Sequence, residues 1–295
     1  MLAWVGRGLE LVGFIWAHPA NQGRRLRAVV RFFAWQASKR VLPRPWDLAV
    51  FGGLRLRCYP DSTVASRTLY YGGLPDYPEM TFMMHYLRAA DGFLDVGANI
   101  GVYTLLAARL VSGTGVVHAV EPGIIASERL RENVDLNELT HVRIHRVAVA
   151  DRPGAVAFTQ IHDAGNRILP NGRVGQEGSR VRAETLDELV GGMRFAMGKM
   201  DIEGAEPLAL RGAEAMLAAA NPPVWQIEFN RIALQRFGCD RPELAFLLAQ
   251  RGFDLARYHP DERRLEFHPR AWEGRRDVLA VARSRRDEVL ERLET

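Results

Sequence analysis

The sequence predicts an α/β protein: a doubly wound, mostly parallel sheet preceded by an N-terminal extension of helices and a hairpin. Two observations predict this class. An apolar strand at 93–96 runs into a glycine-bearing turn and a helix, and strands alternate with helices from there to residue 281. A chain of 295 residues that is 47% hydrophobic can bury a large core. We therefore expect an accessory region at 1–90 and an α/β domain at 91–295.

The first 40 residues predict two helices. Residues 1–17 are apolar but contain Arg7 and Glu10, are shorter than a bilayer span and lack a small-residue cleavage site. We expect a docking helix and no transmembrane segment. The helix predicted at 24–40 surrounds its apolar residues with basic ones: Arg24, Arg25, Arg27, Arg31, Lys39 and Arg40. We expect it to cap the sheet or to pair in a homodimer, with peripheral contact to an acidic membrane as the alternative.

The remaining elements follow from apolar periodicity. Alternating segments at 48–51 and 54–59, joined by Gly52-Gly53, predict a β-hairpin. The other expected strands are 115–120, 142–150, 155–160, 195–202, 224–229, 253–258 and 277–281. The other expected helices are 79–89, 102–110, 126–138, 186–190, 208–219 and 242–250. Residues 162–182 are rich in Gly and Asn without apolar periodicity, so they form either a surface loop or a lid over substrate.

The turn after the first domain strand indicates a ligand. In F-L-D-V-G-A-N-I-G at 93–101, Gly97 and Gly101 permit a close ligand approach that a Cβ would hinder. The acid Asp95 would repel a pyrophosphate, which disfavours a nicotinamide dehydrogenase and favours a cationic amino-acid ligand. S-adenosylmethionine carries an ammonium and a sulfonium and has no phosphate. We therefore take it as the cofactor, with Asp95, Gly97, Asn99 and Gly101 as binding candidates.

Further acids follow later strands. Glu121 ends the strand at 115–120, where a carboxylate can accept hydrogen bonds from both ribose hydroxyls. Asp151 is a candidate for the exocyclic amine of adenine. Taken singly, the glycine turn could be an ordinary connection and Glu121 a solvated helix start. Since ligands bind at the carboxyl ends of parallel strands, we expect five acids near that edge: Asp95, Glu121, Asp151, Asp201 and Glu228.

A second motif, K-M-D-I-E-G-A-E at 199–206, indicates catalysis. Strand alternation would place Lys199, Asp201 and Glu203 on one side. A cation among carboxylates shifts their pKa values and suits a general base, with Asp201 first, Glu203 second and Lys199 orienting them. The two acids and Glu228 could instead bind a divalent metal, although we assign no metal site. The structural alternative is a salt-bridged helix cap that includes Glu206.

Three segments together resemble the FkbM family of S-adenosylmethionine-dependent methyltransferases: F-L-D-V-G-A-N-I-G-V-Y-T at 93–104, A-V-E-P at 119–122 and K-M-D-I-E-G-A-E at 199–206. The third is the most specific. The resemblance implies a Rossmann-like class I methyltransferase, mostly an O-methyltransferase acting on sugars, polysaccharides or secondary metabolites. The sequence departs from the family at F-A-M-G, 195–198, where bulky aliphatic residues are usual. A glycine there weakens strand packing and leaves the placement of Lys199 open.

Other functions remain as alternatives. A non-catalytic domain could keep the cofactor pocket, although it would not need the cluster at 199–206. The N-P-P-V segment at 221–224 is similar to an amino-methylase motif but lacks its aromatic residue and precedes a strand, so an N-methyltransferase is disfavoured. A polyamine synthase would need a second cationic site. We expect a small-molecule or glycan hydroxyl acceptor.

Charge and cysteine content exclude other classes. Thirty-nine basic residues against 35 acidic ones give a net charge of +4, too small and too dispersed to indicate nucleic-acid binding. Cys58 and Cys239 are far apart in sequence, which argues against a disulfide framework or structural zinc. We expect a cytoplasmic protein.

Overall fold

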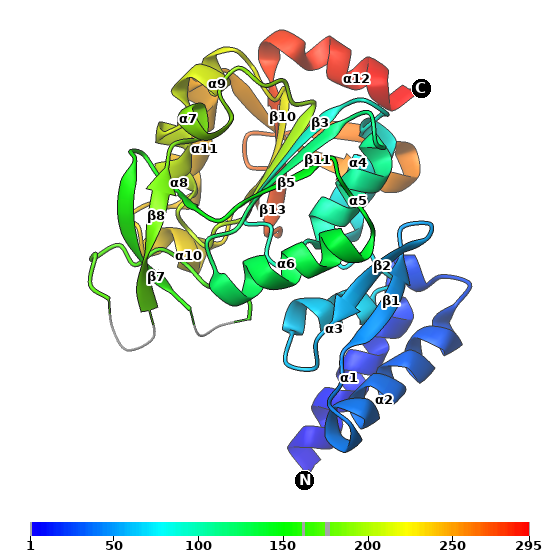
Figure 1. Cartoon of the computed structure of the whole chain (residues 1–295). Helices are drawn as coiled ribbons and strands as arrows, with labels where there is room; N and C mark the ends of the chain where they lie inside the picture. The colour runs from blue at the N-terminus through cyan, green and yellow to red at the C-terminus, as the bar shows by residue number, and fades with distance from the viewer. Residues whose placement is uncertain (1, 161–162, 175–177, 295) are drawn as a thin grey trace.

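The structure, a computed structural model, describes residues 2–160, 163–174 and 178–294. In this part of the chain the central sheet has eight strands in the order β12-β11-β13-β10-β9-β3-β4-β5 (Figure 1). Five are mutually parallel: β3 (Gly92–Val96), β4 (Val116–Val120), β5 (Val142–His145), β9 (Met197–Met200) and β10 (Val224–Glu228). The antiparallel pairs involve β13 (Asp277–Ala282), β11 (Phe253–His259) and β12 (Arg264–Phe267). The predicted fold class is confirmed.

Helices cover both faces of the sheet, and every residue of the central strands β3, β9 and β10 is buried. One face carries α4 (Tyr77–Tyr86), α5 (Val102–Val111), α6 (Ile124–Leu136) and α12 (Arg286–Glu294). The other carries α7 (Leu186–Val190), α8 (Glu206–Arg211), α9 (Glu214–Ala218), α10 (Arg231–Gln235) and α11 (Arg241–Gln250). In β10 the alternation is direct: Val224 faces the first core, and Trp225 and Ile227 face the second.

Three predicted segments were wrong in detail. The strand expected at 142–150 divides, because the chain leaves the central sheet after β5 and β6 (Ala148–Val149) joins a small sheet of order β6-β8-β7. The loop expected at 162–182 ends in β8 (Gly178–Glu184), which pairs with β7 (Gly154–Thr159). The helix expected at 208–219 breaks at Gly212, where a Cβ would lie 2.1 Å from the carbonyl oxygen of Ala150.

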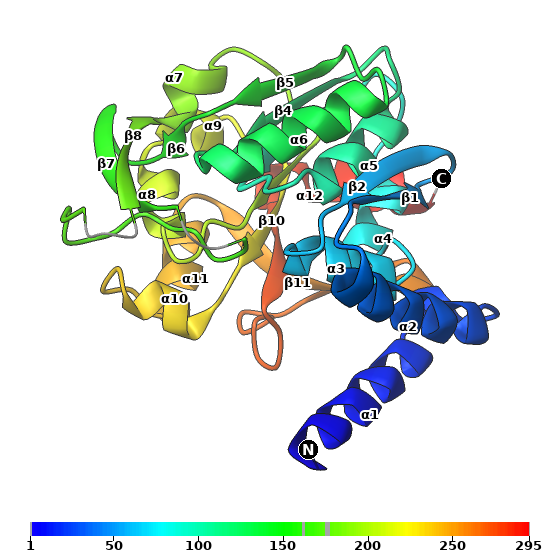
Figure 2. The ribbon, with the colours of Figure 1, turned by 60° about the horizontal axis from the view of Figure 1, so that its bottom comes forward.

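The N-terminal extension contains the two predicted helices and the predicted hairpin. These are α1 (Leu2–Ala17), α2 (Arg25–Val41), β1 (Trp46–Val50) and β2 (Leu54–Cys58), followed by α3 (Thr63–Tyr70), which the sequence analysis did not predict. In Figure 2, α1 and α2 extend from one side of the molecule. The extension nevertheless shares a core with the α/β domain, since Trp35 and Leu69 belong to the same buried cluster as Leu105. The hydrophobic core therefore crosses the boundary that we placed after residue 90.

Candidate active site

A cavity of about 370 Å³ opens at the carboxyl ends of β3, β4 and β9. One wall is the turn after β3, and a second comes from the end of β4 and the start of β6. The segment 164–168 and the extension close other sides. Residues that line it include Val64, Arg67, Asp76, Gly97, Asn99, Tyr103, Glu121, Ile168, Lys199, Asp201, Glu203, Asn230, Arg276 and Asp277. This is the edge at which parallel α/β sheets bind ligands.

The turn after β3 has its backbone N–H groups satisfied internally. Gly97 and Ala98 both donate to the carbonyl oxygen of Val120, at 2.9 and 3.0 Å. Asn99 donates to Oε2 of Glu121 at 2.9 Å, Ile100 to Oδ1 of Asn99 and Gly101 to the carbonyl of Ala98. A phosphate-binding loop needs free N–H groups. This turn has none to offer, and the cavity therefore suits a ligand without phosphate.

The two predicted glycines meet different constraints. Gly97 has φ +83°, and a Cβ on it would lie 1.9 Å from the carbonyl oxygen of Asp201, so the turns after β3 and β9 can touch only through a glycine. Gly101 has φ +92°, and its Cβ would lie 2.6 Å from Leu130 on α6. Gly97 lines the cavity and Gly101 does not, so Gly101 serves the packing of α5 against α6.

Asp95 lies within β3 and is fully buried behind the cavity wall. Oγ1 of Thr104 donates to its Oδ2 at 2.6 Å, while Oδ1 has no hydrogen-bond partner among the described residues. Burial raises the pKa of the carboxyl, and the charge of Lys199 opposes that shift. A buried carboxylate oxygen without a partner, behind a wall without free N–H groups, fits a cationic ligand such as the one expected from the sequence.

Glu121 reaches the cavity from the end of β4. Its Oε1 accepts from the backbone N–H of Gly123 at 2.7 Å, in addition to the bond from Asn99. Burial raises the pKa of Glu121 to about 7, although these two backbone hydrogen bonds lower it. Asp151, by contrast, follows β6 in the small sheet, is exposed and does not line the cavity. The division of the strand at 142–150 removes it from the edge at which we expected it.

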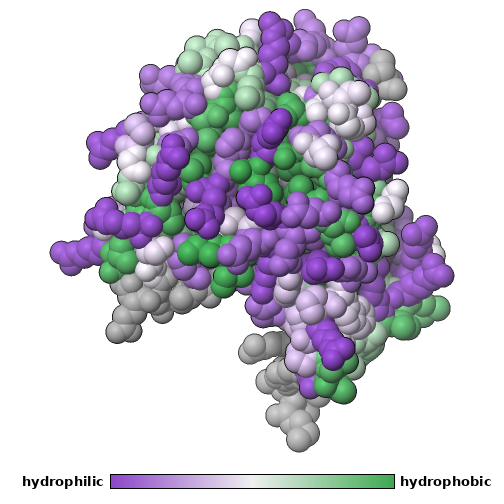
Figure 3. Space-filling model, in the orientation of Figure 1, coloured by the Kyte–Doolittle hydropathy of each residue, from purple (hydrophilic) through white to green (hydrophobic). Residues whose placement is uncertain are grey.

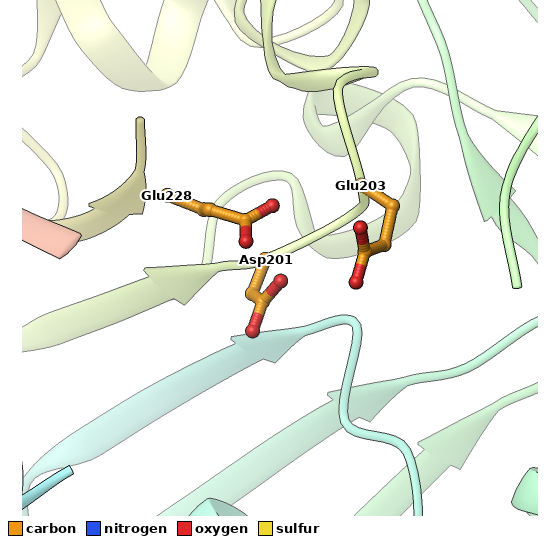
Figure 4. A group of neighbouring side chains, drawn as sticks. All are labelled: Asp201, Glu203 and Glu228. Carbon is orange, nitrogen blue, oxygen red and sulfur yellow. The ribbon is translucent and has the colours of Figure 1, made fainter. Parts of the chain in front are cut away.

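Carboxylates gather in a second part of the cavity, the carboxylate end, which meets the glycine turn where Gly97 approaches Asp201. Asp201 and Glu203 follow β9, and Glu228 ends β10 (Figure 4). One oxygen from each lies within 4.8 Å of the others, which makes this a group that could hold a metal ion. The cluster also has resident cations: Arg276 forms ion pairs with Glu228 and, at 3.3 Å, with Glu203. The absence of a metal therefore stays a prediction.

The environment of Glu203 and Glu228 disfavours their ionisation. Burial and the neighbouring Asp201 raise the pKa of Glu203, and Arg276 opposes the shift. Burial, followed by repulsion from Asp201, raises the pKa of Glu228 to about 10. Glu203 also has φ +56°, a left-handed conformation that is strained for a residue with a Cβ. Unfavourable electrostatics and backbone strain coincide here.

Lys199 lies in β9 and is almost completely buried. Burial lowers its pKa, but Asp201 and Asp95 outweigh that effect and raise it above the ordinary value. Nζ lies 3.4 Å from Oδ2 of Asp201 and 4.8 Å from the centre of the Tyr103 ring. The glycine before it, Gly198, packs against the Trp225 indole, because a Cβ there would lie 2.6 Å from that ring. β9 ends at Met200, so Asp201 and Glu203 lie in the turn after the strand, and of these two only Asp201 pairs with Lys199 among the described contacts.

Glu206 has a structural role within the same motif, although it forms no salt bridge among the described residues. It is fully buried, and its Oε1 accepts from the backbone N–H groups of Ile202 and Gly204 at 3.0 and 3.3 Å. It thereby holds the turn that carries Asp201 and Glu203. The N-P-P-V segment is structural as well: Asn221 bonds to the backbone of Met193 and Phe195 and does not line the cavity.

Several polar residues that line the cavity were not predicted from the sequence. Nε2 of Gln226 donates to the Tyr103 hydroxyl at 3.0 Å, and this hydroxyl donates to Oδ2 of Asp76 at 3.2 Å. Arg276 and Asp277 lie at the start of β13. An antiparallel strand starts where its parallel neighbours end, so the position of β13 could have identified these two. No local signal marked Asp76, which belongs to the extension.

The segment after β7 covers the part of the cavity beside the glycine turn at 97–101, which we call the glycine-turn end. Nδ2 of Asn99 donates to the carbonyl oxygen of Asp163 at 2.9 Å. The Asp163 carboxylate accepts from Oγ1 of Thr63 at 2.8 Å and lies 3.5 Å from the Arg129 guanidinium. Ala164, Gly165, Asn166 and Ile168 line the cavity. The first part of the expected lid therefore lies over the site; its mobility stays a prediction, and His162 lies outside the described residues.

Comparison with known proteins identifies a family. Residues 95–255, more than half of the chain, match the methyltransferase FkbM domain. No curated protein matches the chain. Among solved structures, an S-adenosylmethionine-dependent O-methyltransferase from Thermotoga maritima shares 15% identity and a TM-score of 0.37, over 70% of this chain and 65% of that one.

Two other solved structures have similar scores. A SAM-dependent methyltransferase from Aquifex aeolicus shares 14% identity and a TM-score of 0.40, over 75% of this chain and 93% of that one. Aeropyrum pernix fibrillarin, with natively bound S-adenosylmethionine, shares 10% identity and a TM-score of 0.36, over 66% and 67%. The family match carries the assignment. The chain belongs to the FkbM methyltransferase family and uses S-adenosylmethionine as its cofactor.

Proposed function

We propose that this methyltransferase acts on a hydroxyl oxygen of a sugar, a polysaccharide or a secondary metabolite. The observation that carries the proposal is the position of Asp201, a cavity-lining carboxylate whose side chain is one-third exposed and 3.4 Å from Lys199. A hydroxyl must lose its proton when its oxygen accepts a methyl group, and a carboxylate at this place can take that proton. Bound S-adenosylmethionine supplies an electrophilic methyl group on its sulfonium.

The glycine-turn end supplies the proposed cofactor contacts. Glu121 retains lone pairs for the ribose hydroxyls, since each of its oxygens accepts one backbone hydrogen bond. Gly97 and Asn99 shape the wall, and Asp95 contributes negative charge from behind it. Gly101 acts through packing, and Asp151 lies outside the cavity lining.

The carboxylate end of the cavity supplies the proposed acceptor contacts. Donor and acceptor side chains are mixed there: Arg67, Asp76, Asn230, Arg276 and Asp277. Such a mixture suits a ligand with several hydroxyl groups, each of which both donates and accepts. Within it, Asp201 is our first choice of base, because Glu203 is held by Arg276; Lys199 orients Asp201. Alignment of the acceptor oxygen supplies most of the rate.

A panel of sugars and polyols, scored by release of S-adenosylhomocysteine, tests the proposal. With the best acceptor, Asp201→Asn should lower turnover by about 10²–10⁴, the usual contribution of general-base catalysis, while cofactor affinity stays within a few-fold. Asp151→Asn is the matched control: the same change at an exposed acid outside the cavity should alter neither quantity.

Other outcomes would contradict specific parts. Methyl transfer to amines only would exclude the hydroxyl acceptor, and full activity of Asp201→Asn would exclude Asp201 as base. Loss of wild-type activity on chelation, with recovery on added magnesium, would make Asp201 and Glu203 metal ligands. Cofactor binding without turnover of any acceptor would favour the non-catalytic alternative.

A further inference from the structure

Helix α2 has two apolar faces, and the core explains only one. Ala28, Phe32 and Trp35 are buried and pack in the core shared with the α/β domain. A second set recurs at helical spacing on another side of α2 and is 58% to 82% exposed: Leu26, Val30, Phe33 and Val41. No part of the described chain covers this second set, which we call the α2 stripe.

Exposed apolar side chains continue next to the α2 stripe. Phe14 and Trp16 at the end of α1 are exposed, as is Leu42 directly after α2. The guanidinium of Arg25 lies 5.7 Å from the centre of the Trp16 ring, so the two helices meet on this side. Hydrophobic surface appears at the lower end of the molecule in Figure 3, where these helices lie. Scattered exposed apolar residues are ordinary, but a gathered set marks an interaction surface.

The charge of this region specifies the partner. Residues 11–46 contain seven of the 39 basic residues and none of the 35 acidic ones, which leaves 32 basic against 35 acidic residues in the rest of the chain. The net positive charge of the protein therefore resides in α1, α2 and their flanks. Arg24, Arg25 and Arg27 are exposed at the start of α2, and Arg44 follows its end. The partner must offer negative charge and an apolar phase together.

A second copy of the chain meets only half of that requirement. It would cover the α2 stripe, but it would bring two segments of seven positive charges together. Nucleic acid would match the charge and leave the apolar side chains in water. An anionic lipid surface meets both needs, since apolar side chains enter the acyl boundary while arginines remain among the headgroups.

We propose that α1 and α2 dock on an anionic lipid surface through the α2 stripe and its flanking arginines. No helix in the described ranges is long and apolar enough to span a bilayer, so α2 would lie in the plane of the interface. The buried face of α2 keeps the helix attached to the domain meanwhile. The sequence alternatives for this helix are thus combined: it caps the protein core on one side and contacts lipid on the other.

Vesicle flotation of the full chain tests the proposal. The protein should float with phosphatidylcholine vesicles that contain about 30% phosphatidylserine, and neither with pure phosphatidylcholine nor in high salt. Val30→Ser with Phe33→Ser should lower the partition coefficient at least about tenfold, since two apolar side chains that would enter the lipid are lost. Arg24→Glu with Arg27→Glu should lower it by a similar factor. These residues are exposed, so the fold should persist.

Phe246→Ser on α11 is the matched control, because Phe246 is 62% exposed and far from the basic segment in sequence. It should leave flotation unchanged. The proposal is wrong if the wild type does not float with anionic vesicles, if the control reduces flotation equally, or if charge reversal has no effect. A concentration-dependent dimer that Val30→Ser with Phe33→Ser makes monomeric, without vesicle binding, would identify a subunit interface instead.

Discussion

The two ends of the cavity differ in how far their polar groups are hydrogen-bonded and in the strain of their backbone. At the glycine-turn end the N–H groups of the turn have partners within the protein, and both oxygens of Glu121 accept backbone hydrogen bonds. At the carboxylate end Glu203 has a left-handed backbone, and Oε2 of Glu228 has no partner among the described residues. The backbone of the first end is hydrogen-bonded without a ligand, and only Oδ1 of Asp95 behind it has no partner among the described residues. The second end combines a left-handed Glu203 with two acids whose ionisation is disfavoured, as expected where chemistry takes place.

The first prediction concerns the glycine-turn end. Gly97→Ala would place a Cβ 1.9 Å from the carbonyl oxygen of Asp201 at a φ of +83°. We expect a loss of about 2–4 kcal/mol in the free energy of unfolding, since overpacking adds to left-handed strain. Cofactor binding should be lost with it, because the turns after β3 and β9 must separate. Chemical denaturation and calorimetry measure the two effects.

Gly238→Ala separates the cost of left-handed strain from the cost of overpacking. Gly238 has φ +67°, but a Cβ there would meet nothing within 4 Å, so only the cost of the conformation applies, about 1–2 kcal/mol. Equal losses in the free energy of unfolding in both variants would mean that the close approach of Gly97 to Asp201 adds nothing to the effect of Gly97→Ala. The contact between the turns after β3 and β9 would then not contribute to stability.

The second prediction concerns the carboxylate end and its pH dependence. The pKa of Glu228 is raised to about 10 from an ordinary 4.5, so between these values the folded protein binds the proton more tightly than the unfolded chain. This contribution to stability is full below pH 4.5 and is lost as pH rises toward 10. Glu228→Gln should therefore lose less stability than the wild type between pH 5 and 9, by at most about 1.4 kcal/mol per pH unit.

Denaturation at several pH values measures this difference, with Glu266→Gln as control. The pKa of Glu266 is lowered by its hydrogen bond from His259, so its titration lies below the tested range. The control should follow the wild-type curve. Identical curves for Glu228→Gln and the wild type would show that the pKa of Glu228 is not raised in the folded protein.

Sequence signals predicted the glycine-turn end better than the carboxylate end, for a physical reason. β3, its turn and α5 are contiguous, and their apolar spacing and glycines are local properties of residues 92–111. The carboxylate end is assembled from β9, β10, the start of β13 and the extension. Asp76 and Arg276 therefore come to line the same cavity only in the folded chain. The position that we expected for Asp151 was wrong for the same reason, since only the sheet topology shows that β5 and β6 belong to different sheets.

The smallest expected effect concerns Asp163, which connects the glycine-turn end to the extension through Asn99 and Thr63. Asp163→Ala removes hydrogen bonds to the start of α3, worth about 1 kcal/mol. Hydrogen exchange should quicken at 163–168 and not in α5, and cofactor affinity should fall a few-fold. Asp61→Ala is the control, because Asp61 also pairs with Arg129, at 2.7 Å, but it is not the residue that accepts hydrogen bonds from Thr63 and Asn99. If Asp61→Ala has the same effect, Asp163 acts only through Arg129. If only Asp163→Ala loosens the segment, the extension holds the cover of the cavity in place, and the accessory region takes part in cofactor binding.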